Sequence, residues 1–126
     1  MNSRFTMRAE APAYSRRIVR SILIGEDVEK IEAAALLTSE LVTAAMRDGS
    51  RDPDLFVDVR RGHLHVEVYD SHSTSSPVRV DAGADPLEPS SPATRESALR
   101  IFDELSSDWG QEVRPDISAL WFDLDL

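Results

Sequence analysis

One stretch of this chain, residues 55–70 with the sequence LFVDVRRGHLHVEVYD, limits its possible folds more than any other. Apolar residues recur at every second position on both sides of the pair Arg61-Gly62. This period of two is typical of strands with one buried face, and a short glycine-containing link between two such runs is typical of a hairpin turn. The apolar positions are Leu55, Val57, Val59, Leu64, Val66 and Val68. The stretch therefore predicts an antiparallel hairpin with one buried face.

Two helices are expected before this hairpin. The first runs from Ala13 to Ile24, carries apolar residues at helical spacing among arginines, and stops at Gly25. The second runs from Glu26 to about Arg47 and is apolar around more than one side, which predicts that it is covered by two neighbours. A short strand around Phe5 to Met7 is expected before both helices.

The second half of the chain predicts a loop, a helix and another hairpin. Residues 71–93 hold four prolines and six serines without a sustained period, so we expect a flexible, lid-like loop. Ser91-Pro92 is typical of a helix start, and that helix should continue to about Ser106. The stretches SDWGQEVR and SALWFDLDL then predict two closing strands.

This order of elements predicts one domain, residues 1–126, of the α+β class. We expect a two-layer sandwich in which a mainly antiparallel sheet carries helices on one face. Nine apolar side chains are expected between the two layers: Leu36, Val42, Val57, Val66, Val68, Ile101, Phe102, Leu120 and Phe122.

Charge and composition argue against several classes of partner. Asp and Glu outnumber Lys and Arg by 23 to 14, giving a formal net charge of -9 that repels nucleic-acid backbones and anionic membranes. There is no cysteine, no continuous apolar run of about 20 residues, and no apolar signal segment near the N-terminus. We therefore expect a soluble cytoplasmic protein that binds neither nucleic acid nor membrane directly.

Four stretches carry a resemblance to a known family: SELVTAAMRDG at 39–49, VEVYD at 66–70, ESALRIFDELSSDWG at 96–110 and DISALWFDLDL at 116–126. In order and layout, the chain from Phe5 to Leu126 resembles the GHKL ATPase fold in its small single-domain form. That form comprises the anti-sigma-factor serine kinases and their actinobacterial relatives. The resemblance implies sigma factors and anti-anti-sigma proteins of the STAS fold as partners.

The resemblance also assigns roles to particular positions. Glu40 matches the general base toward the phosphoryl acceptor, and Asp70 matches the aspartate that contacts the adenine amino group. Ala44 stands where the family has an asparagine that binds magnesium, and a methyl group has no lone pair for a hard cation. Glu96 and Ala98 stand at two glycines that let backbone N–H groups cradle the phosphates. The resemblance thus implies a degenerate ATP site.

Four residues keep simpler interpretations open. Glu40 either faces solvent, as most helical glutamates do, or lines a cleft as a remnant of the general base. Asp70 is either a turn-forming residue after a strand or a remnant of the adenine contact. His63 and His65 have a spacing that can hold a metal, but no further nearby ligand supports it, so we expect no metal site.

Several hypotheses about function follow. The leading one is a regulatory protein of the anti-sigma factor type that acts in transcription control by protein binding and uses no cofactor. The alternative is an active serine kinase that uses ATP and magnesium to phosphorylate a STAS partner. A third is an adaptor to a DNA-binding regulator. The apolar stretches RFTM and RRIVRSIL also suggest a homodimer.

Overall fold

The computed structural model describes residues 3–47, 53–70, 100–113 and 118–126. The predicted loop at 71–93 and the helix start at Ser91-Pro92 lie outside these ranges, as do Glu96 and Ala98.

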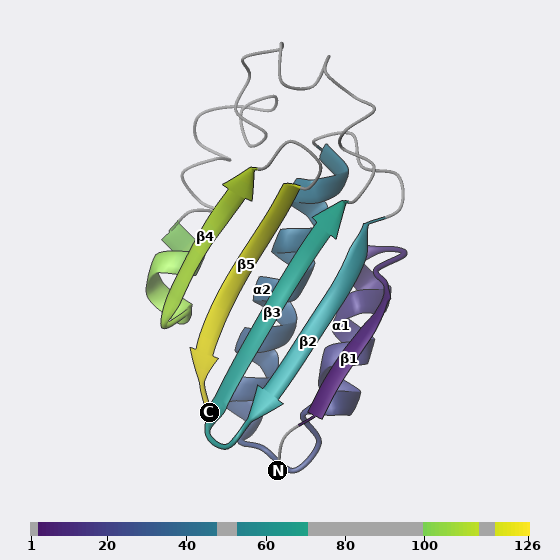
Figure 1. The fold of residues 1–126 in the computed structure, drawn as a ribbon. Coiled ribbons are helices and arrows are strands. Elements are labelled where there is room, and N and C mark those ends of the chain that lie inside the picture. The colour runs from purple at the N-terminus through teal and green to yellow at the C-terminus, as the bar shows by residue number, and fades with distance from the viewer. Residues whose placement is uncertain (1–2, 48–52, 71–99, 114–117) are drawn as a thin grey trace.

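Five strands form one sheet in which every pairing is antiparallel (Figure 1). Across the sheet the order is β1-β2-β3-β5-β4. The strands are β1 (Ser3–Arg8), β2 (Asp54–Arg60), β3 (His63–Asp70), β4 (Asp108–Val113) and β5 (Ser118–Asp125). The first hairpin is confirmed, since β2 and β3 are neighbours and Gly62 in the turn has a φ of 68°, a conformation that favours glycine.

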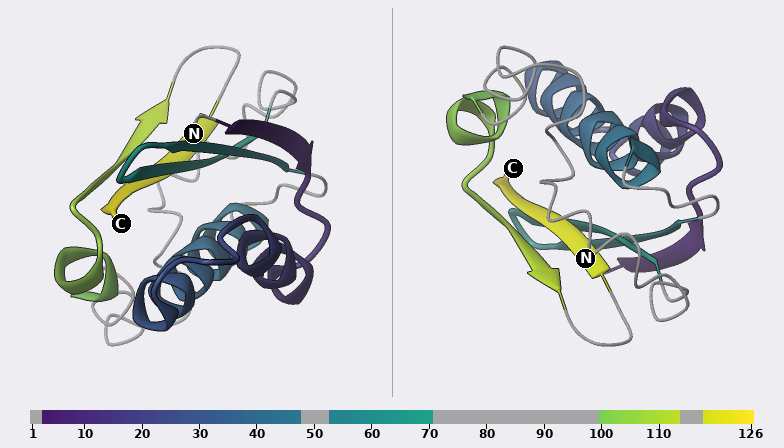
Figure 2. Two further views of the ribbon diagram at one scale, coloured as in Figure 1. Left: turned by 90° about the horizontal axis from the view of Figure 1, so that it is seen from below. Right: turned by 90° about the horizontal axis from the view of Figure 1, so that it is seen from above.

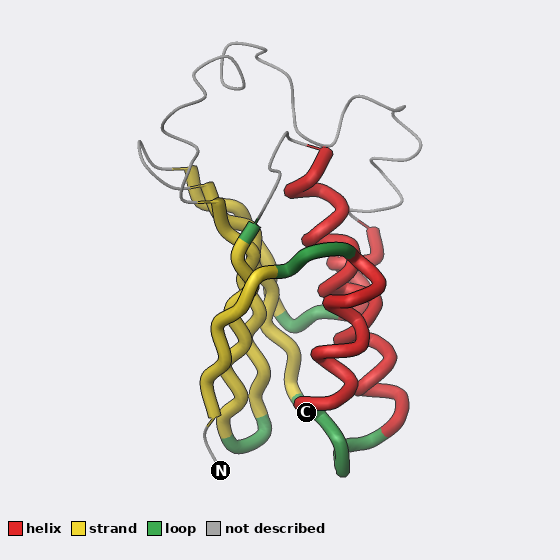
Figure 3. Tube along the Cα trace, turned by 90° about the vertical axis from the view of Figure 1, so that its right-hand side faces the viewer, coloured by secondary structure: helices red, strands yellow, loops and turns green. Residues whose placement is uncertain are grey.

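The helices α1 (Pro12–Ile22) and α2 (Val28–Arg47) lie together on one face of this sheet (Figures 2 and 3). A helical segment at residues 100–105 lies on the same side. Pro12 occupies the first turn of α1, where its missing N–H costs nothing, and Gly25 with a φ of 100° lies in the link between the helices. The predicted α+β two-layer sandwich is therefore confirmed.

The core lies between the sheet and the helices. The predictions for Val42, Val57, Val66, Val68, Phe102 and Phe122 are confirmed, because these side chains are buried together with Val19, Leu23, Leu37, Leu41, Leu55 and Leu64. Ile101 and Leu120 are only partly buried and pack against this cluster. The alternation read from the hairpin thus correctly identified the inner face of β2 and β3.

The prediction for Leu36 is wrong, since 40% of this residue is exposed whereas none of Leu37 is. Helix α2 contacts α1 on one side and β3 and β5 on another, as its broad apolar pattern predicted. Adjacent residues of a helix point in directions about 100° apart. Leu36 therefore faces the remaining, solvent-facing side of α2 although Leu37 is fully buried.

No helix in the described ranges is long and apolar enough to cross a membrane.

Candidate functional site

The first candidate region is the C-terminal half of α2, which carries Glu40. Glu40 is partly buried, and it has no hydrogen bond or ion pair within the described part of the chain. Its polar neighbours are occupied by the helix itself: the Thr38 hydroxyl donates to the carbonyl of Ala34 at 2.7 Å, and the Ser39 hydroxyl donates to that of Leu36 at 2.8 Å. Partial burial without a described partner agrees with neither a fully solvent-facing Glu40 nor a paired one, so both the solvent-facing and the cleft-lining interpretations stay open.

Ala44 lies one turn beyond Glu40 and is buried, with 6% of the residue exposed. Its methyl group faces the protein interior and offers no oxygen or nitrogen to a cation. Within the described ranges, no group of three or more His, Cys, Asp or Glu residues could hold a metal ion. Ala44 itself therefore supplies no ligand to a magnesium ion.

Asp70 is the last residue of β3 and is paired in register with Ser118 at the start of β5. It stands two residues after Val68, in the same alternating series as the buried Leu64, Val66 and Val68. Helix α2 and strand β3 both end at the same end of the molecule, the upper end in Figure 1. The fold therefore brings the segments that carry Glu40, Ala44 and Asp70 to one end of the sandwich.

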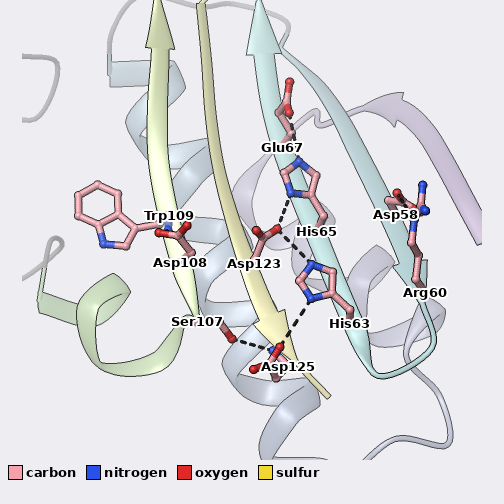
Figure 4. Close-up of polar contacts among 10 residues, drawn as sticks. All are labelled: Asp58, Arg60, His63, His65, Glu67, Ser107, Asp108, Trp109, Asp123 and Asp125. Carbon is pink, nitrogen blue, oxygen red and sulfur yellow. Dashed lines mark hydrogen bonds and ion pairs between the residues drawn. The ribbon is translucent and has the colours of Figure 1, made fainter.

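A second arrangement lies on the opposite, outer face of the sheet (Figure 4). The pairing of strands puts Asp58 of β2, His65 of β3 and Asp123 of β5 in one row across the sheet. His65 Nδ1 lies 2.5 Å from Asp123 Oδ1, and His65 Nε2 lies 3.2 Å from Glu67 Oε1. Both ring nitrogens thus contact a carboxylate, which requires a protonated imidazole if both are to donate.

His63 extends this arrangement toward the end of β5. Its Nε2 lies 3.5 Å from Asp123 Oδ1, the same oxygen that contacts His65, and its Nδ1 lies 3.6 Å from Asp125 Oδ1. The two histidines of β3 therefore contact three carboxylates, one on β3 itself and two on the adjacent β5. We name these five residues the histidine–carboxylate cluster: His63, His65, Glu67, Asp123 and Asp125.

The cluster changes the protonation of His65. Burial lowers the pKa of His65, but hydrogen bonds to Asp123 and Glu67, together with the attraction of both negative charges, raise it by more. The net result is a pKa above the ordinary value of 6.5. The neighbouring carboxylates therefore favour the imidazolium form on this face.

Aromatic side chains adjoin the cluster. The rings of Phe56 and Trp121 lie on either side of His65, with centroids 6.3 Å and 5.8 Å from the imidazole. Trp121 also covers Gly110 of β4, where an added Cβ would lie 2.8 Å from the indole Cζ2 atom. Glycine at this position therefore gives the indole space to lie against β4.

Sequence reasoning considered His63 and His65 but missed their acidic partners. The alternation in HLHVEVYD and WFDLDL places all five cluster residues on the outer face of their strands. This pattern does not show the order of the strands in the sheet. In the structure β5 lies beside β3, and β4 is the edge strand. That order brings Asp123 and Asp125 next to histidines about 60 positions earlier in the chain.

In comparisons with known proteins, no protein-family model and no curated protein matches this chain.

Proposed function

We propose that this chain is a regulatory protein of the GHKL anti-sigma factor type with a degenerate ATP site, acting in transcription control by binding other proteins. Its antiparallel sheet with helices on one face agrees with the fold that the resemblance implies. Fold alone does not define function, so the proposal depends on the residues at the former nucleotide positions. We place this activity in the cytoplasm, where sigma factors act.

The buried Ala44 is the observation that carries the proposal. In the family that the chain resembles, an asparagine at this position supplies an oxygen that binds magnesium. Here the methyl group of Ala44 is buried in the protein instead. Without that ligand, metal-bridged phosphates lose a direct contact and cannot be positioned for transfer in the usual way. We therefore expect the protein to need no cofactor for its regulatory role.

The proposed partners are a sigma factor, a STAS-type anti-anti-sigma protein, or both. The net charge of -9 favours a partner with a basic surface and disfavours direct contact with nucleic acid or an anionic membrane. A second copy of the chain is also proposed as a partner, because β1 lies at the sheet edge and Phe5 on it is 38% exposed. Sedimentation at micromolar concentration that shows only monomer would remove the homodimer.

The alternative is an active serine kinase that phosphorylates a STAS partner with ATP and magnesium. Glu40 favours it, because by the resemblance this residue stands at the position of the general base. Its carboxylate has no hydrogen bond or ion pair within the described residues. If this alternative holds, the acceptor serine must lose its proton to Glu40 while the phosphoryl group is transferred.

Capture from a native cell extract tests the proposal. The immobilised protein should retain a sigma factor or a STAS protein equally well with and without added Mg-ATP, and should transfer no phosphate from labelled ATP to the retained STAS protein. The variant Glu40→Gln is the matched control, since it removes the remaining candidate base while keeping the side-chain shape. Retention that requires Mg-ATP, or labelling that disappears in Glu40→Gln, would replace the proposal by the kinase.

A further inference from the structure

We propose that the open face of β3, β5 and β4 is a docking surface for an arginine-bearing segment of a protein partner. This inference rests on the proposed function in one respect, namely that the chain acts by binding protein. It adds the surface that is used and the chemistry of the segment that it recognises.

The first argument is the aromatic surface at the centre of the sheet. Both helices and the segment 100–105 lie on the other face, so nothing described covers this one (Figures 2 and 3). Phe56 of β2 and Trp121 of β5 are both opposite Glu67 of β3, and the ring of each lies beside that of His65. All three aromatic residues are half-buried. Tryptophan is a frequent anchor of protein interfaces, and its ring face attracts guanidinium groups.

The second argument is the distribution of charge on this face. The strands β3, β5 and β4 contain no lysine or arginine, and their outer positions carry Glu67, Asp108, Asp123 and Asp125. The arginines of the sheet belong to the other half, where Arg4 and Arg60 contact Asp58 at 3.8 Å and 3.1 Å. A cationic segment is therefore directed to the β3-β5-β4 half and away from β1 and β2.

The geometry of the two arguments together favours arginine over a simple cation. Glu67 and Trp121 are directly opposite each other in the β3–β5 register, and Asp123 follows two residues after Trp121 on the same face. A planar guanidinium that stacks on the indole would have carboxylates on two sides to accept its hydrogen bonds. This combination of ring and carboxylates is the chemistry that recognises arginine.

His65 makes the docking pH-dependent, because its imidazolium competes for the same carboxylates. The charged groups around it are Asp58 opposite on β2, Asp123 opposite on β5, and His63 and Glu67 on β3 itself. Beyond these, Arg4 of β1 contacts Asp58, and Asp108 of β4 is opposite Asp123. Loss of the proton from His65 frees the carboxylates, so a cationic segment should bind more tightly as the pH rises.

The test is an NMR titration of the isotope-labelled protein with an amidated hexa-arginine peptide. Signals of His63–Glu67 and Trp121–Asp125 should shift, including the indole N–H of Trp121. The exposed acidic residues Glu26, Asp27 and Glu29 between and at the start of the helices serve as an internal control and should shift little. Equal shifts in both regions, or shifts only in the control region, would overturn the proposal. So would an equal response to a hexa-lysine peptide, which would indicate unspecific attraction.

Two matched variants sharpen the result. Glu67→Gln keeps the side-chain shape and should weaken hexa-arginine binding by about tenfold, the loss expected for one hydrogen bond to a charged group. Glu29→Gln removes the same charge from α2 and should change the affinity by less than about twofold. Equal losses in both variants would contradict the proposal. Neither a sigma factor nor ATP enters this experiment, so its failure leaves the proposed function to its own test.

Discussion

Gly110 is a single residue on which the packing of the outer sheet face depends. An added Cβ would lie 2.8 Å from the indole of Trp121, which is too close for any undisturbed contact. We expect Gly110→Ala to lower the free energy of unfolding by about 1 to 3 kcal/mol, because the indole must move. Chemical denaturation measures this loss.

The indole supplies the control for this prediction. In a Trp121→Val background the added methyl group meets no ring, so the same Gly110→Ala change should cost clearly less. A cost that is equal in both backgrounds would show that the strain comes from the backbone of β4 and not from Trp121.

His65 gives the fold a pH dependence whose direction follows from the cluster. Its pKa in the folded protein is raised above 6.5, because hydrogen bonds and attraction from Asp123 and Glu67 exceed the effect of burial. A raised pKa stabilises the fold fully below about pH 6.5, and the gain is lost as the pH rises through the folded-state value. The unmodified protein should therefore exceed His65→Gln in unfolding free energy by more at about pH 6 than at about pH 9.

Denaturation at the two pH values measures this difference, with His63→Gln as the comparison. His63 makes only longer contacts to Asp123 and Asp125, at 3.5 Å and 3.6 Å, so its removal should cost less at the lower pH. A difference for His65→Gln that does not change with pH would mean that its imidazolium adds nothing to stability.

At the scale of single residues, the sequence predicted the sheet face on which a residue lies better than it predicted the residues that it contacts. The alternation in β2 and β3 correctly separated buried Val57 and Val66 from outer His65. It could not identify Asp123 as the partner of His65, because two strands far apart in sequence are paired by the whole fold. The roles of Glu40 and Asp70 remain predictions, since residue identity alone does not show what a carboxylate contacts.

At the scale of elements, α2 offers a matched pair of leucines that tests the arrangement of the layers. Leu37 is fully buried, whereas its neighbour Leu36 is 40% exposed. We expect Leu37→Ala to lower the free energy of unfolding by about 2 to 5 kcal/mol, and Leu36→Ala by about 1 kcal/mol or less. Denaturation of the two variants under one condition measures both losses, and a larger loss for Leu36→Ala would contradict the packing of α2.

Helices and strands were predicted well where one periodicity persisted. Both hairpins and both N-terminal helices were expected, and their ends differ from the structure by only one or two residues. The face of α2 was predicted less well, because an apolar pattern around most of a helix does not show which side stays open. Leu36 and Leu37 look equivalent in sequence, and only the position of α1 and the sheet distinguishes them.

At the scale of the whole molecule, the fold class followed from the sequence but the function did not. Short hairpin links and one-sided strands leave few arrangements besides a sheet with helices on one face. Such a sandwich supports many activities, so the proposed regulatory role depends on a few residue positions and not on the fold. Two of these positions, Glu96 and Ala98, lie outside the described residues.

The central proposal is that this protein does not support productive nucleotide binding. By the resemblance, Ala44 stands where the family has a magnesium ligand, and Glu96 and Ala98 stand where it has glycines beside the phosphates. Each lost hydrogen bond to a charged group is worth about 1.5 to 3 kcal/mol, so two or three losses weaken a site by roughly a thousandfold or more. Since the losses are distributed, Ala44→Asn alone should restore nothing, whereas the same change combined with Glu96→Gly and Ala98→Gly should recover weak binding.

Calorimetry of the unmodified protein with Mg-ATP tests this claim most directly. We predict no measurable heat of binding at sub-millimolar nucleotide, with the combined variant measured beside it. A dissociation constant in the low micromolar range for the unmodified protein would contradict the account and favour the kinase.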